Sequence, residues 1–245
     1  VVGTALLTLG VSQLLRFGWE ISLLVYASGL IVLALYLLFV PYGKEEKHHE
    51  AHQEGKGLTA AQWFLTIGLA LVAAVIVLTN VVINVRVPGL VEKSGMGSVQ
   101  TAGLILSSMQ LIGIAAGLSF APLLHYFKEN LLTVAGVVFG LTAIMIGLAP
   151  NLLLLSVVTI ASGFVYSVSL TSIFHILSER IPSKSLNQAT SIVILGCSAG
   201  ATATTFFLSL ISQFSSQASF IFGVLGSLMV LMAVLAFGLL KKKSA

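Results

Sequence analysis

The chain has 245 residues, of which 57% are hydrophobic and 8% are charged. A soluble domain carries roughly 25% charged residues, so this composition excludes a water-soluble fold. The net charge of +4 comes from basic residues in short loops and in the tail 241–243, where they act as orientation signals rather than as a nucleic-acid surface. Because Cys197 is the single cysteine, no intrachain disulfide can form.

Eight hydrophobic segments follow one another along the chain, and each is predicted to be a membrane helix or part of one. The predicted spans are residues 1–15, 18–41, 60–85, 98–124, 131–149, 152–177, 187–212 and 218–240. The first span starts at Val1 without an initiator Met or a charged leader, which is expected for the tail of a longer helix rather than for a signal peptide. The sequence therefore predicts an all-α integral membrane protein.

Residues 42–58 form the only long hydrophilic segment, which we interpret as a solvated linker. It separates the end of a preceding bundle, residues 1–41, from a six-helix bundle over 59–240 and a short tail at 241–245. If the linker became helical, His48, His49 and His52 would offer two imidazoles one turn apart to a metal ion. Only glutamates stand nearby, and nothing would fix a ligand geometry, so we expect no metal site.

The positions of lysine and arginine predict the orientation. Nine of them fall in the linker, the loops near 128 and 180–184, and the tail, whereas Arg16, Arg86 and Lys93 lie on the other side. Loops rich in Lys and Arg stay in the cytoplasm. We therefore expect an integral protein of a bacterial-type plasma membrane, with its linker and carboxy terminus cytoplasmic.

Polarity along the predicted helices follows a period of three. The spans 18–41, 131–149 and 218–240 carry few Ser, Thr, Asn or Gln residues and suit lipid on all sides. The other complete spans are much more polar, and an unsatisfied polar group in hydrocarbon costs several kcal/mol. We therefore expect these four helices to turn their polar faces toward protein or a water-filled cavity.

At 100° per residue the polar positions of these helices gather on faces. On 187–212, one face carries Asn187, Ser191, Ser198, Thr202, Thr205 and Ser209, with Gly196 and Gly200 roughly opposite. On 152–177, one face carries Ser156, Thr159, Gly163, Tyr166 and Ser167. The candidate substrate-binding residues, chosen on such faces at non-terminal depth, are Asn80, Asn84, Ser107, Gln110, Thr159, Tyr166, Ser198 and Thr202. For Asn80 and Asn84, hydrogen bonding to a neighbouring helix stays open beside substrate binding.

The linker, the paired polar helices and two sequence stretches resemble the carboxy-terminal half of a major facilitator superfamily transporter. The stretches are PGLVEKSGMGSVQTAGLILS at 88–107 and SERIPSKSLNQATS at 178–191. The resemblance implies that 1–15 ends the fifth transmembrane helix, 18–41 is the sixth, and the rest are the seventh to twelfth. It also implies alternating access between two six-helix halves, with a missing amino-terminal half as partner. The loop 124–130, LHYFKEN, keeps the length but not the pattern of the family's loop signature.

Three pairs of glycines at four-residue spacing allow close helix packing, namely Gly113 with Gly117, Gly136 with Gly140, and Gly196 with Gly200. Packing within the bundle is the simplest interpretation for all of them. The resemblance places Gly113 and Gly117 at the seam between the two halves, where helices slide. A second local feature, the sequence neighbours Glu179 and Arg180, is predicted to form a weak ion pair at a helix end.

The chain contains no Asp, and Glu20, Glu92 and Glu179 lie near span ends or in loops. Proton coupling usually needs an intramembrane acid or His, and an anionic solute needs a mid-span cation. We therefore expect a secondary transporter of a small neutral, lipophilic or cationic solute, of the drug-efflux kind, and neither an enzyme nor a cofactor-binding protein. The alternatives are a permease subunit of an ATP-driven transporter and a non-transporting polytopic membrane protein. A retinal-type receptor is disfavoured because the last span has no lysine before Lys241.

Overall fold

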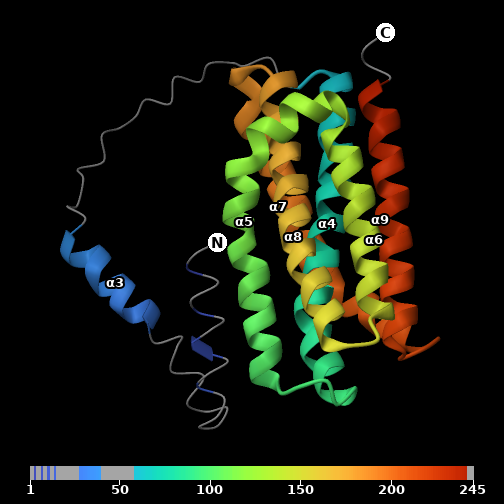
Figure 1. The fold of residues 1–245 in the computed structure, drawn as a ribbon. Coiled ribbons are helices and arrows are strands. Elements are labelled where there is room, and N and C mark those ends of the chain that lie inside the picture. The colour runs from blue at the N-terminus through green and yellow to red at the C-terminus, as the bar shows by residue number, and fades with distance from the viewer. Residues whose placement is uncertain are drawn as a thin grey trace.

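The structure, a computed structural model, describes residues 58–241, the helix Ser28–Phe39 and five isolated helical positions before it, 3, 7, 10, 11 and 14. The described part of the chain is helical and contains no strand. Figure 1 shows six long helices standing side by side as a bundle, with α3 (Ser28–Phe39) apart from them. The bundle helices are α4 (Ala60–Lys93), α5 (Val99–Phe127), α6 (Leu131–Leu148), α7 (Leu152–Arg180), α8 (Ser183–Ser212) and α9 (Ala218–Lys241).

Five continuous helical stretches among the described residues are long and apolar enough to cross a membrane. One of them, Val99–Leu148, folds back at the 3-10 turn η3 (Lys128–Asn130), so α5 and α6 run antiparallel (Figure 1). Even the shortest helix of the bundle, α6 with 18 residues, reaches about 27 Å at 1.5 Å per residue, close to the ~30 Å of a hydrocarbon core. The chain therefore has the transmembrane helices expected of a polytopic membrane protein.

The start of α4 is set by a capping box. The backbone N–H of Thr59 donates to Gln62 Oε1 at 2.9 Å, and the N–H of Gln62 donates to Thr59 Oγ1 at 3.4 Å. This exchange satisfies two of the N–H groups that a helix start leaves unpaired. The helix therefore begins at Ala60, as the sequence predicts.

The far end of α4 differs from the prediction, because the helix runs past 85 and through Pro88 to Lys93. Proline lacks an N–H, so the carbonyl of Asn84 loses its helical partner. The helix nevertheless continues, because Val87 and Val91 are fully buried and packing outweighs the local defect. The start of α8 also differs, lying at Ser183 rather than 187.

Three helix pairs make the closest contacts of the bundle: α6 with α9, α4 with α8, and α5 with α7. Small residues allow this proximity. A Cβ on Gly140 of α6 would lie 2.7 Å from the carbonyl oxygen of Gly226 in α9, and a Cβ on Gly163 of α7 would clash with the backbone of Met109 in α5. The side chains of Phe139 and Phe222 fill the core beside these contacts and are fully buried.

The outer faces of α6 and α9 are apolar. Their exposed large side chains include Leu141, Met145, Leu148, Leu231, Val234 and Leu235. Both helices correspond to spans that the sequence assigns to lipid, and their exposed surface has the composition that lipid requires. The apolar side chains of α3 for which burial is described are exposed as well.

Candidate functional site

The helix α8 has two chemically distinct faces. One face exposes the polar side chains of Asn187, Ser191, Ser198, Thr202, Thr205 and Ser209, together with the apolar Ile194 and Leu195. The opposite face packs on α4, where a Cβ on Gly196 would lie 2.5 Å from the carbonyl oxygen of Ala70 and a Cβ on Gly200 would clash with the backbone of Ala74. The division of this helix into an exposed polar face and a glycine-lined packing face is confirmed.

The eight candidate residues share one level of the bundle but differ in exposure. At 1.5 Å per residue they lie about 10 to 21 Å from the bundle end that carries the α4–α5 loop. Asn80, Ser107 and Thr159 are buried, whereas Asn84, Gln110 and Tyr166 are half-buried. Only Ser198 and Thr202 are exposed.

The predicted polar face of α7 is turned into the protein. Thr159 is fully buried, and Gly163 packs against α5. Tyr166 is half-buried, with its ring 6.1 Å from that of Phe139 in α6. This face was expected to meet either protein or a water-filled cavity, and in the structure it meets protein.

Many hydroxyl groups of the bundle are satisfied within their own helix. Ser107 donates to the carbonyl of Gly103 at 2.8 Å, and Thr202 donates to that of Ser198 at 3.0 Å. The same bond to the third or fourth preceding carbonyl is made by Thr79, Ser108, Thr142, Ser156, Ser162, Ser169, Ser172, Ser191, Thr204, Ser212 and Ser227. For the residues that make these bonds the backbone is the hydrogen-bond partner, so they do not themselves require a neighbouring helix or water.

The amides of α4 are less completely satisfied. Asn84 Nδ2 donates to the carbonyl of Asn80 at 2.8 Å, whereas Asn80 Oδ1 is buried without a hydrogen-bond partner. The Oγ1 of Thr159 in α7 is also buried and unpartnered. Together with the carbonyl that Pro88 leaves free on Asn84, these groups give the bundle interior unused hydrogen-bonding capacity. They are polar groups of the bundle interior for which a ligand or a water molecule would supply the missing partner.

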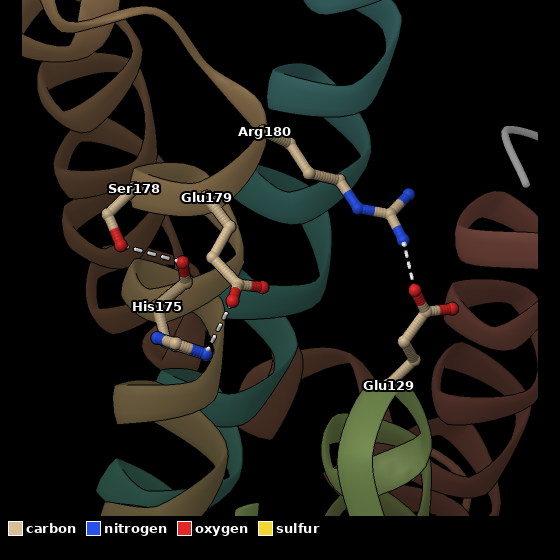
Figure 2. Close-up of polar contacts among 5 residues, drawn as sticks. All are labelled: Glu129, His175, Ser178, Glu179 and Arg180. Atoms are coloured by element: carbon tan, nitrogen blue, oxygen red, sulfur yellow. Dashed lines mark hydrogen bonds and ion pairs between the residues drawn. The ribbon is translucent and has the colours of Figure 1, made fainter.

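A second polar cluster ties the helix ends at the opposite side of the bundle. Figure 2 shows Arg180 of α7 reaching across to Glu129, at 3.6 Å, while His175 pairs with Glu179 at 3.4 Å. Arg180 also donates to the carbonyl of Leu240 in α9 at 3.2 Å. The predicted pair between Glu179 and Arg180 is therefore wrong, because adjacent side chains on a helix diverge by 100° and each finds another partner.

This cluster links η3, α7 and α9, and sequence reasoning missed it. The sequence contains one indication of this cluster. Charged residues are scarce in the chain, and Glu129 and Arg180 lie in loops that are predicted to be on the same side of the membrane. Because charged residues are so few, opposite charges that lie at the same end of the bundle have few other partners. Because Glu129 and Glu179 are exposed, each ion pair contributes at most about 1 kcal/mol.

Two of the three glycine pairs are packed inside the described bundle. Gly136 and Gly140 lie against α9, and Gly196 and Gly200 lie against α4. Gly117 of α5 differs, because a Cβ there would meet no atom within 4 Å. Its neighbour Leu118 is 81% exposed, so this face of α5 is uncovered.

Other predicted features fall at or beyond the limits of the described residues. Within the described ranges, no group of three or more His, Cys, Asp or Glu residues is arranged to hold a metal ion. His48, His49 and His52 lie outside those ranges, as do Glu20 and the linker. The two helices predicted at 1–15 and 18–41 are described only at the isolated positions and in α3.

Comparison with known proteins gives no assignment: no family model matches this chain, and no curated protein and no solved structure is significantly similar to it.

Proposed function

We propose that this chain forms half of the solute pathway of a secondary transporter of the major facilitator type. In this proposal the bundle α4 to α9 is the carboxy-terminal half, and α3 belongs to the preceding amino-terminal one. The solute is small and neutral, lipophilic or cationic. The protein works by alternating access, in which two halves rock about a site near the midplane of the membrane.

The exposed polar face of α8 is the observation that carries the proposal. It lies in a bundle whose helices α6 and α9 expose apolar side chains such as Leu141 and Leu231. A single Ser or Thr bonded to its own helix could face lipid, but six polar positions on one face, the amide of Asn187 among them, are not expected of a lipid-facing helix. A water-filled pathway between this face and a second bundle accounts for them.

The uncovered face of α5 supports the second bundle. A Cβ on Gly117 would meet nothing within 4 Å, as is also the case for Gly89 of α4 and for Gly223 and Gly238 of α9. A small residue on an exposed face lets an incoming helix approach closely. We propose that a helix of the amino-terminal half contacts α5 there and slides during the transport cycle.

The positions of the charged residues support a neutral or cationic solute. Of the described acidic residues, Glu92, Glu129 and Glu179 are all exposed and lie at helix ends. Of the cations near this level, Arg86 lies about 10 Å from the end of α4, at the edge of the pathway level, and lines a separate space together with Lys93. The pathway level itself offers amides and hydroxyls, which bind neutral or cationic groups through their oxygens. The coupling acid, if the protein is proton-driven, belongs to the other half.

Transport in inverted membrane vesicles tests the proposal, with ethidium as a lipophilic, cationic probe. The vesicles contain the chain alone or the chain together with its amino-terminal bundle. We expect saturable accumulation only when both halves are present, driven by an ion gradient and not by ATP. Accumulation that requires ATP would instead favour a permease subunit, and robust transport by the 245-residue chain alone would refute the two-half pathway.

Asn84→Ala tests the role of α4 in the same vesicles. We expect it to weaken the apparent affinity for ethidium by about fivefold, as loss of one hydrogen bond of roughly 1 kcal/mol does. The matched control is Asn130→Ala, because Asn130 is exposed and makes no side-chain capping bond. If Asn84→Ala lowers protein abundance but leaves affinity unchanged, the α4 amides serve only to hold helices together.

A further inference from the structure

Two basic side chains near the end of α4 have no acidic partner. Arg86 is half-buried, and its Nε is enclosed without any hydrogen-bond partner. Lys93, the last residue of the helix, is exposed. The ion pairs of the described residues involve His175 and Arg180, at the opposite end of the bundle, and neither Arg86 nor Lys93. Glu92, the acid nearest in sequence, does not line the space that these two cations share.

That space is a cavity of about 510 Å³ between the carboxy-terminal ends of α4 and α8 and the start of α9. Arg86 and Lys93 line its α4 side, and Ala218 lines it from the first turn of α9. The amino terminus of a helix carries a partial positive charge, which adds to that of the two side chains. Its remaining walls are mainly apolar and include Val85, Leu208 and Phe222.

The length of α4 places this cavity at the edge of the membrane. The helix has 34 residues and spans about 51 Å, more than the 40–45 Å of a bilayer with its headgroups. The stretch from Arg86 to Lys93 covers roughly the last 10 Å, so it lies at headgroup depth. A half-buried guanidinium whose Nε is enclosed without a hydrogen-bond partner favours an anion at such a site, and a phosphate is the anion that the surroundings supply.

We propose that this cavity binds the phosphate of an anionic phospholipid, with Arg86 as the principal ligand and Lys93 at the rim. A free phosphate ion would use the two cations but would gain nothing from the apolar walls. A lipid uses both parts, because its headgroup meets the cations while the first segment of an acyl chain lies along Leu208 and Phe222. The site is independent of the solute pathway, since none of the eight pathway residues lines it.

Native mass spectrometry of the 245-residue chain in a neutral detergent tests this proposal. The protein is mixed with equal amounts of phosphatidylglycerol and phosphatidylcholine that carry the same acyl chains. We expect one phosphatidylglycerol to be retained in preference to phosphatidylcholine. Arg86→Gln should weaken this binding at least about tenfold, as loss of a charged hydrogen bond does. Lys93→Gln should weaken it about threefold, because its ammonium group is exposed.

Three controls decide the outcome. Lys184→Gln removes the same charge from an exposed position at the other end of the bundle and should leave retention unchanged. Arg86→Lys keeps the charge and should preserve part of the affinity, which separates loss of charge from loss of fold. Inorganic phosphate is added as a competitor, and it should displace the lipid only weakly.

Equal retention of the two lipids, or an Arg86→Gln protein that binds phosphatidylglycerol as the unaltered chain does, would overturn the proposal. If inorganic phosphate displaces the lipid at comparable concentration, the cavity holds a soluble anion and the assignment to a lipid is wrong. If Lys184→Gln reduces retention as much as Lys93→Gln does, the selectivity comes from net charge and not from this cavity.

Discussion

The contact between α4 and α8 gives a stability prediction whose size follows from the structure. An alanine at Gly196 would place its Cβ 2.5 Å from the carbonyl oxygen of Ala70 and 3.0 Å from the Ala70 Cβ. Ordinary contact begins at 3.4 Å, so the two helices must separate by about 0.9 Å to admit the methyl group. The obstructing oxygen belongs to the backbone of a packed helix and cannot turn aside as a flexible side chain would.

Overpacking of this kind costs about 1–3 kcal/mol. The same substitution also gains up to about 1 kcal/mol, because alanine favours a helix interior over glycine. Gly117→Ala isolates this gain, since a Cβ on Gly117 meets no atom within 4 Å. The difference between the two alanine variants is therefore the cost of the contact, about 1–3 kcal/mol, with Gly196→Ala the less stable.

Thermal unfolding of the chain in mild detergent measures this difference. For a chain of this size 1 kcal/mol corresponds to about 2–4 °C, so Gly196→Ala should melt about 2–12 °C below Gly117→Ala. Both variants differ from the original chain by one methyl group in a helix, which removes composition as a cause. Equal melting temperatures, or a lower one for Gly117→Ala, would show that α8 does not pack on α4 as described.

Two further predictions concern topology and the pathway, both in a Cys197→Ser background. Single cysteines at 49 and 94, in place of His49 and Ser94, should be labelled from opposite sides of the membrane, the first from the cytoplasm; labelling of both from outside would reverse the orientation. In the full two-half protein, cysteines replacing Ser198 and Thr202 should react with a water-soluble thiol reagent, whereas those replacing the exposed Val138 of α6 and Leu231 of α9 should react poorly. Equal reactivity at all four positions would remove the distinction between a wet face and a lipid face.

Much of the fold could be predicted from helical periodicity, and the residues of α8 show why. The faces of α8 were predictable because Ser198, Thr202 and Thr205 recur every three or four residues and therefore share one face, while Gly196 and Gly200 fall opposite. Such a pattern depends only on local geometry. The same reasoning located five of the six bundle starts within about one residue, because apolar runs with polar ends identify membrane helices.

What sequence alone did not predict depends on tertiary contacts. The ion pair between Glu129 and Arg180 joins segments far apart in the chain, and no local pattern distinguishes it from the adjacent Glu179. The passage of α4 through Pro88 likewise depends on the burial of Val87 and Val91 by other helices. The sequence also left open whether the polar face of α7 meets protein or water, because the contact of Gly163 with the backbone of Met109 joins two different helices.

The hydrogen bonds within helices determine which polar residues are informative about function. A Ser or Thr that donates to its own helix, as Ser107 and Thr202 do, is tolerated at many positions and is weak evidence for a water-filled pathway. An amide cannot satisfy both of its ends in this way. The Nδ2 of Asn84 donates to the carbonyl of Asn80, whereas Asn80 Oδ1 is buried without a hydrogen-bond partner. The affinity of an Asn84→Ala protein therefore tests the pathway more stringently than the reactivity of cysteines at the hydroxyl positions.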